Sequence, residues 1–144
     1  MIQCLLKRYS FANIRWLYKQ ANHESGYLTS RLYNENNNIF GMSCVRKRPT
    51  TQVGCVDLSD GNTNGIYTSN WSCVKDRLMW DVEFNISPRS EDYANLVSAR
   101  FHPLGQTYRA RVDATGDEGY SEDLLVTALL PIAPITLLSI AFFT

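Results

Sequence analysis

The apolar positions near the start of the chain predict a helix over about residues 11–24. Ser10 can cap its N-terminus, and Gly26 stands where a helix commonly stops. Glu24 then lies at the C-terminal end, where the negative end of the helix dipole makes a carboxylate costlier to ionise. We therefore expect a carboxyl group that stays protonated near neutral pH. The buried face consists of residues at helical spacing: Phe11, Ile14, Leu17, Tyr18 and Ala21.

Three further stretches have helical spacing, over about residues 72–84, 90–101 and 106–112. Between the first two helices, residues 43–70 carry β-branched residues separated by Gly, Asn and Asp. Two dipeptides there, Asp60-Gly61 and Asn64-Gly65, are hairpin signals, so this part predicts a small strand-and-turn lobe. The apolar faces expected for the second and third helices are Val74, Leu78 and Val82, then Tyr93, Leu96, Val97 and Phe101.

The last part of the chain, residues 124–144, contains no charged residue. As a helix it would extend about 31 Å, close to the hydrocarbon thickness of a bilayer. Pro131 and Pro134 would kink it, which membrane helices tolerate; the alternative is a buried core helix. The pattern as a whole predicts an α+β fold, predominantly α, with a domain over residues 1–123 and a C-terminal transmembrane anchor over 124–144.

Composition and charge narrow the possible partners. The chain has 144 residues, of which 44% are hydrophobic and 19% charged, as expected for a globular chain. All 14 Lys and Arg lie between Lys7 and Arg111 with nine acids, an excess of 14 − 9 = +5. A mildly basic body suits an anionic polymer such as a cell wall, although a solvated surface without a partner gives the same count. No nucleic-acid motif is found, and the N-terminal residues do not have the form of a signal peptide.

The cysteines predict no metal site. None of Cys4, Cys44, Cys55 and Cys73 forms a C-x-x-C pair, and only two histidines could add ligands. We expect no cofactor. A Cys44–Cys55 bridge across a hairpin and free buried thiols both remain open.

Three motifs occur in order along the chain. The first is Glu24-Ser25-Gly26, then Ser30, then Asn37-Asn38-Ile39-Phe40-Gly41. The second is "RPTT" (48–51) followed by "GIYTSNWSCVKDRLMW" (65–80), and the third is "DEGYSEDLL" (117–125). Together they resemble the glucosaminidase family, the peptidoglycan hydrolases that include autolysins and the flagellar muralytic domain. The resemblance covers about residues 10–123.

The resemblance implies a lysozyme-like fold and roles for individual residues. Glu24 is the expected general acid and Tyr120 is expected to line the reactive subsite, with a packing role as the alternative. The chain departs from the family where a second catalytic carboxylate is expected; the candidates are Asp57 and Asp60, and Asp57 is the predicted one. The expected substrate-binding residues are Ser30, Asn38, Phe40, Tyr67 and Trp71. The alternatives are that Asn38 holds the turn, that Phe40 anchors the junction of the lobe, and that Tyr67 and Trp71 pack in the core.

The function that follows is cleavage of the β-1,4 bond after N-acetylglucosamine in peptidoglycan, which needs a proton for the leaving oxygen and a group to stabilise the oxocarbenium-like centre. The alternatives are a muramidase, a lytic transglycosylase, or a non-catalytic virion membrane protein that keeps the fold. The expected partners are glycan strands, a lipid membrane through residues 124–144, and capsid or other virion proteins. The expected location is the internal membrane of a virion, from which the enzyme acts on the host cell wall.

Overall fold

A computed structural model describes residues 8–58 and 61–116, and its first element is helix α2 (Phe11–Ser25). The helix starts at Ser10, whose hydroxyl accepts a hydrogen bond from the backbone N–H of Asn13. It ends at Gly26, which takes the left-handed conformation (φ 58°) and donates its N–H to the Asn22 carbonyl. The predicted first helix and both of its end signals are confirmed.

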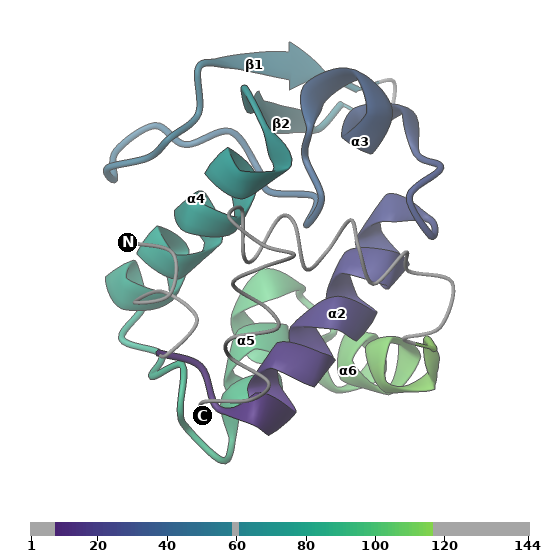
Figure 1. Cartoon of the computed structure of the whole chain (residues 1–144), viewed down its shortest axis with the longest axis vertical. Coiled ribbons are helices and arrows are strands. Elements are labelled where there is room, and N and C mark those ends of the chain that lie inside the picture. Colours follow the sequence, from purple (N-terminus) through teal and green to yellow (C-terminus); the bar gives the residue numbers. More distant parts are fainter. Residues whose placement is uncertain (1–7, 59–60, 117–144) are drawn as a thin grey trace, which may run out of the picture.

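Four more helices follow along the described chain: α3 (Arg31–Asn36), α4 (Asn70–Glu83), α5 (Tyr93–Phe101) and α6 (Gly105–Ala114) (Figure 1). Helix α3 was not predicted, because six residues are too few to show a helical period. Helix α5 begins later than Ser90, since residues 90–92 form a turn in which Tyr93 donates its N–H to the Ser90 carbonyl.

The strand lobe is an antiparallel hairpin of β1 (Gly54–Asp57) and β2 (Thr63–Ile66), with Gly54 opposite Ile66. The hairpin that the Asp60-Gly61 signal predicts is observed, because β1 pairs with β2 and Leu58 donates its N–H to the Asn62 carbonyl (2.8 Å). The Asn64-Gly65 signal is wrong. Gly65 lies inside β2, where a Cβ atom would be 2.3 Å from the Gln52 side chain, so the glycine there permits a close approach rather than a turn.

Residues 42–44 run beside β2 and tie the hairpin to the rest of the chain. Gly65 donates its N–H to the Met42 carbonyl (3.0 Å), and Cys44 donates to the Thr63 carbonyl (2.9 Å). A disulfide joins Cys44 to Cys55, with Cα atoms 5.7 Å apart, so the bridge alternative is the one observed. Cys73 is a buried free thiol.

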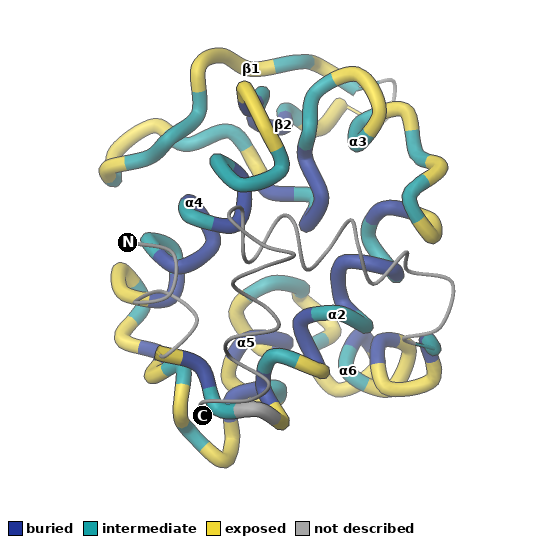
Figure 2. The backbone as a smooth tube through the Cα atoms, in the orientation of Figure 1, coloured by how far each residue is buried: buried dark blue, intermediate teal, exposed yellow. Residues whose placement is uncertain are grey.

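The core lies where α2 packs against α5 and α6, and where α5 packs against α6 (Figure 1). Buried and exposed positions alternate around the helices, as expected for amphipathic elements (Figure 2). Leu17 and Ala21 are buried as predicted, and Ile14 and Tyr18 are partly buried against the same cluster. Trp16 is buried as well, with its indole N–H donated to Asp113.

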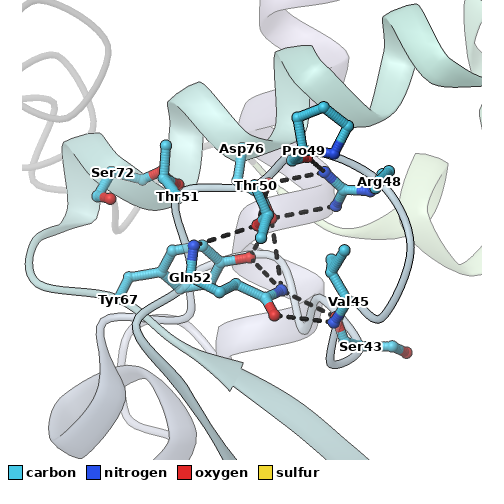
Figure 3. Close-up of polar contacts among 10 residues, drawn as sticks. All are labelled: Ser43, Val45, Arg48, Pro49, Thr50, Thr51, Gln52, Tyr67, Ser72 and Asp76. Carbon is cyan, nitrogen blue, oxygen red and sulfur yellow. Dashed lines mark hydrogen bonds and ion pairs between the residues drawn. The ribbon is translucent and has the colours of Figure 1, made fainter.

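The strand lobe is fastened to α4 by one buried carboxylate, Asp76 (Figure 3). Arg48 donates to both of its oxygens (2.7 and 3.1 Å), Thr50 donates to Oδ1 (2.6 Å) and Tyr67 donates to Oδ2 (2.5 Å). Thr51 adds a hydrogen bond to the Ser72 carbonyl (2.6 Å). The "RPTT" motif is therefore the segment that clamps the lobe onto α4.

The structure corrects the predicted fold class. The described residues form a small α+β domain of five helices and a two-stranded sheet, not a lysozyme-like fold with a transmembrane helix. The described helices have 6 to 15 residues and polar faces, and none has the length and apolar character needed to cross a membrane. Residues 124–144, for which the sequence predicts the anchor, lie outside the described residues, and so does the predicted domain boundary at 123.

Candidate active site

Glu24 lies in the last turn of α2 and is held between α6 and the loop that enters the strand lobe. Tyr108 of α6 donates a short hydrogen bond to its Oε1 atom. On the other side, Gly41 (φ 63°) approaches so closely that a Cβ atom would lie 2.8 Å from Oε2. Only glycine combines this backbone conformation with the space for the carboxyl group. The two oxygens of Glu24 therefore face different surroundings.

The ring of Tyr108 is fixed from several sides. Phe101 and His102 stack on it, with ring centroids 5.7 and 5.4 Å away. His23 meets it edge-on at 5.5 Å. These contacts hold the phenol hydroxyl in one position relative to Glu24, as expected for a ring that is enclosed by other rings.

A buried chain of hydrogen bonds fixes the direction of the Tyr108 proton. The Arg77 guanidinium donates to Gln20 Oε1 (2.7 Å), which leaves the Gln20 amide to donate to the Tyr108 oxygen (3.1 Å). Since that oxygen accepts from Gln20, its own proton points to Glu24. Because a guanidinium can only donate hydrogen bonds, each group from Arg77 to Glu24 has a single possible role as donor or acceptor.

Arg77 is itself anchored at the centre of the molecule. It is 1% exposed and forms an ion pair with Asp81, Nε to Oδ1 at 3.4 Å. The other oxygen of Asp81 accepts hydrogen bonds from the hydroxyls of Tyr9 and Tyr93, both at 2.7 Å. The guanidinium also lies 5.2 Å from the ring centroid of Phe40. The hydrogen-bond chain that ends at Glu24 thus starts at a fully enclosed charge.

Burial raises the pKa of Glu24 above its ordinary value, and it is the largest influence on this carboxyl group. The hydrogen bond from Tyr108 and the charges of Arg77 and Arg111 lower the pKa, but they compensate only in part. The direction agrees with the sequence prediction, although burial, rather than the helix dipole, is the main cause. The pKa of His23, by contrast, is lowered by burial and by the nearby Arg111 and His102.

A pocket of about 550 Å³ adjoins this site. Its walls are the loop of residues 41–48, the C-terminal turn of α4 and the end of α5. Glu24 is not one of the described residues that line it. The pocket meets the site through Gly41, which touches the Glu24 carboxyl group, and through Phe101, which stacks on Tyr108. The volume is in the range of small-molecule sites, roughly 300–1,000 Å³.

The structure does not bring Asp57, the predicted second carboxylate, to Glu24. Asp57 is exposed on β1 and accepts a hydrogen bond from Thr63 at 3.1 Å. Gly41 touches Glu24, and β2 and residues 42–44 lie between Gly41 and β1. Tyr120, the predicted subsite residue, lies outside the described part of the chain, as does Asp60.

The predicted substrate-binding residues have structural contacts. Ser30 caps α3 by accepting the N–H of Tyr33, and buried Asn38 bonds the backbone of Met42 and Gly65. Phe40 is 1% exposed beneath Arg77.

The two aromatic candidates in the second motif also pack inward. Tyr67 is buried and donates to Asp76, while Trp71 is partly buried against the core. Each of the five predicted substrate-binding residues therefore has contacts that hold the fold together.

Sequence reasoning missed Tyr108, Gln20 and Arg77, the residues that hold Glu24. Tyr108 lies in a helix that was predicted, but 84 positions separate it from Glu24, and no local motif joins them. Gln20 and Arg77 lie in predicted helices for which only apolar positions were assigned to the buried face. A signal was present only in three dimensions.

The chemistry available is that of one tunable acid. The other buried carboxylates, Asp76 and Asp81, are held in ion pairs with Arg48 and Arg77. Burial raises the pKa of the Cys73 thiol to about 12, so it is not a nucleophile near neutral pH. Within residues 8–58 and 61–116, no cluster of His, Cys, Asp or Glu could hold a metal ion.

Comparison with known proteins does not assign this site. No protein-family model matches the chain, and no curated protein or solved structure matches it. The resemblance to the glucosaminidase family rests on the three sequence motifs alone.

Proposed function

We propose that this protein is a glycoside hydrolase that cleaves the β-1,4 bond after N-acetylglucosamine in peptidoglycan. The observation that carries the proposal is the state of Glu24, a partly buried carboxyl group with a raised pKa beside a pocket. Such a group can supply a proton near neutral pH, which is the requirement for a departing sugar oxygen. The three motifs that resemble the glucosaminidase family name the same residue.

In the proposed first step, Glu24 acts as the general acid. Because Oε1 accepts the Tyr108 hydrogen bond, the proton of the neutral carboxyl group resides on Oε2, the oxygen next to Gly41. That proton moves to the glycosidic oxygen as the bond from this oxygen to C1 breaks. Tyr108 and the charge of Arg77 stabilise the carboxylate that forms, since both lower the Glu24 pKa.

In this proposal the nucleophile that attacks C1 is the acetamido oxygen of the N-acetylglucosamine that carries C1. It forms a bond to C1 as the leaving oxygen departs, which yields a cyclic oxazolinium ion. Water then opens this ion at C1 and gives its proton to the Glu24 carboxylate, which restores both the acid and the acetamido group. The exposed position of Asp57 on β1 favours this route, because it needs one protein carboxylate rather than two.

The test is hydrolysis of purified sacculi by the full-length protein, its Glu24→Gln variant and a Glu91→Gln control. Glu91 is exposed at the turn before α5 and matches the chemical change. We expect Glu24→Gln to lose about 10²- to 10⁴-fold in rate and the control to keep wild-type activity. Wall clearing by Glu24→Gln at the wild-type rate would reject Glu24 as the acid.

Mass spectrometry of the products separates the related activities. New reducing ends on N-acetylglucosamine are expected. Reducing ends on N-acetylmuramic acid would indicate a muramidase, and 1,6-anhydro products a lytic transglycosylase. Asp57→Asn should keep activity within about twofold, as most surface substitutions do; a hundredfold loss would restore a two-carboxylate mechanism. Binding without any product would indicate the non-catalytic alternative.

Delivery of the enzyme to a host wall by a virus particle belongs to the same proposal, with capsid proteins as its neighbours. Its basic body suits a polymer that carries acidic groups.

A further inference from the structure

The pocket beside Glu24 has a floor of aromatic rings and a rim of positive charge. The floor is formed by Trp80, Phe84 and Phe101, with Trp80 centred 5.0 Å from Phe84 and 5.8 Å from Phe101. These rings give the pocket an apolar lining against which a sugar ring can pack.

The rim of the pocket holds four basic residues and one acidic residue. The charge of Arg48 is compensated by buried Asp76, which leaves Arg46, Lys47 and Arg100 against Glu83, a balance of 3 − 1 = +2. Arg46 and Lys47 are exposed in the loop, and Arg100 lies 4.1 Å above the Phe84 ring. These three uncompensated cations therefore line the same pocket as the aromatic rings.

We propose that this pocket binds carboxylate groups carried by the glycan, so that the enzyme selects acidic glycans over neutral polymers of N-acetylglucosamine. The inference rests on the proposed function. A sugar ring lies on the aromatic floor, and its acidic substituent faces Arg46, Lys47 and Arg100. In intact peptidoglycan the carboxylates belong to the attached peptide, which is joined to the lactyl group through an amide bond. Removal of the peptide by an amidase frees the lactyl carboxylate itself.

The position of the pocket makes this selection local to the cleaved bond. Gly41 is shared between the pocket wall and the Glu24 contact, so a sugar in the pocket is adjacent to the sugar whose bond Glu24 protonates. The loop that carries the cations is also the segment that Arg48 clamps to α4. Because Arg48 holds the loop against α4, Arg46 and Lys47 stay at a fixed position. This favours selective binding over non-specific electrostatic attraction.

The experiment compares two full-length double variants with equal loss of charge. Arg46→Gln/Lys47→Gln removes the loop cations, and Arg8→Gln/Arg109→Gln removes two cations that do not line the pocket. Three substrates are used: intact sacculi, glycan strands stripped of peptide by an amidase, and neutral N-acetylglucosamine oligomers. We expect the loop variant to lose about tenfold in kcat/KM on sacculi, mainly through KM, and less than twofold on the neutral oligomers.

The arms of the experiment identify the carboxylate and can overturn the inference. A loss confined to sacculi assigns the peptide carboxylates, and a loss confined to stripped strands assigns the lactyl carboxylate. A tenfold loss on both shows that the pocket binds either carboxylate. An equal loss on all three substrates, or the same loss in the Arg8→Gln/Arg109→Gln control, rejects the pocket as an acid-binding site.

A binding measurement separates this inference from the catalytic proposal. Calorimetry with Glu24→Gln protein measures the affinity for stripped strands and for peptide-bearing soluble fragments, with and without the loop substitutions. A tenfold weakening by the loop substitutions on either ligand supports the inference even if no product is ever formed. Unchanged affinity for both ligands rejects it even if Glu24 proves to be catalytic.

Discussion

At the scale of single residues, Glu24 shows how burial and chemistry oppose each other. Burial raises its pKa, which means that the folded protein holds the neutral form better than the ionised form. The contribution of Glu24 to stability is therefore fully present below the unfolded pKa of about 4.3, and it is lost as the pH rises through the folded pKa.

The first prediction concerns stability. Glu24→Gln keeps the acceptor for Tyr108 but carries no charge, so we expect it to unfold at a higher temperature than the wild type at pH 8. At pH 4 the difference should shrink, since the wild-type carboxyl group is then largely neutral. Circular dichroism melts at both pH values measure this, with exposed Glu35→Gln as the control. A variant that is less stable at both pH values would contradict the assigned pKa direction.

The second prediction concerns Tyr108. Its hydrogen bond lowers the Glu24 pKa, so Tyr108→Phe should raise that pKa further. The proposed mechanism needs the protonated acid, so the alkaline limb of the kcat profile should move to higher pH while kcat falls about tenfold. Tyr33→Phe, in a partly buried ring of α3, is the matched control. An alkaline limb that stays in place would show that Tyr108 does not act through Glu24.

At the scale of elements, the Asp76 cluster joins the lobe to α4, and the Cys44–Cys55 bridge joins two segments within the lobe. Burial raises the pKa of Asp76, but the hydrogen bonds from Arg48, Thr50 and Tyr67 together outweigh it and the pKa is lowered. The stability from this group is present above the unfolded Asp pKa of about 3.9 and is lost as the pH falls through the folded pKa.

The third prediction is that Asp76→Asn costs about 3 kcal/mol of unfolding free energy at pH 7, because buried Arg48 loses its counter-ion. Urea titration measures the loss, and Asp92→Asn at an exposed position is expected to change little. At pH 2 the gap between Asp76→Asn and the wild type should narrow. A constant gap across this pH range would show that the charge of Asp76 is not what holds the lobe.

The fourth prediction concerns the disulfide, which closes a loop with a sequence separation of 11. A loop of this length is worth about 3 kcal/mol in the chain-entropy account. Cys44→Ser/Cys55→Ser should therefore melt at a lower temperature, and a reductant should lower the wild-type melting temperature to a similar value. The double variant serves as its own control, since the reductant should leave it unchanged. A reductant effect of equal size on both proteins would exclude the bridge as its target.

Elements with local signals were predictable, and those that depend on distant partners were not. The caps Ser10 and Gly26 placed α2 and with it Glu24, because capping is decided within a few residues. The role of Gly65 depends on Gln52, which the local hairpin rule ignores. For the site, the position of Glu24 at the end of α2 was predictable and its partner Tyr108 was not, since helix periodicity reports which face is apolar and not which helix it meets.

At the scale of the whole molecule, Arg77 joins the helices. It bonds Gln20 of α2, Asp81 of α4 and Tyr93 of α5. The pattern of apolar positions predicted Val82 as part of the buried face of α4, yet Val82 is 58% exposed while Arg77 and Asp81 are buried. A sequence pattern that sorts residues by hydropathy cannot predict a charged core, because the charges are tolerated only as a matched pair.

The fifth prediction tests that core. Arg77→Met leaves Asp81 buried without a counter-ion and should cost about 3–5 kcal/mol at pH 7. Part of the loss should be recovered as the pH falls, because protonated Asp81 needs no partner; the pKa of an unpaired buried carboxylate is raised, so its stability is lost as the pH rises. Chemical denaturation from pH 7 to pH 4 measures this, with Lys75→Met on the same helix as the control. No recovery at pH 4 would assign the loss to packing alone.

The contact between Gly41 and Glu24 links the position of the strand lobe to the protonation of a carboxyl group in helix α2. The lobe backbone at Gly41 lies directly against Oε2 of Glu24, so part of the burial that raises the pKa of this carboxyl group comes from the lobe. If that contact were lost, Glu24 would be more hydrated and its pKa would fall. The absence of a side chain at Gly41 therefore helps to set how firmly Glu24 holds its proton.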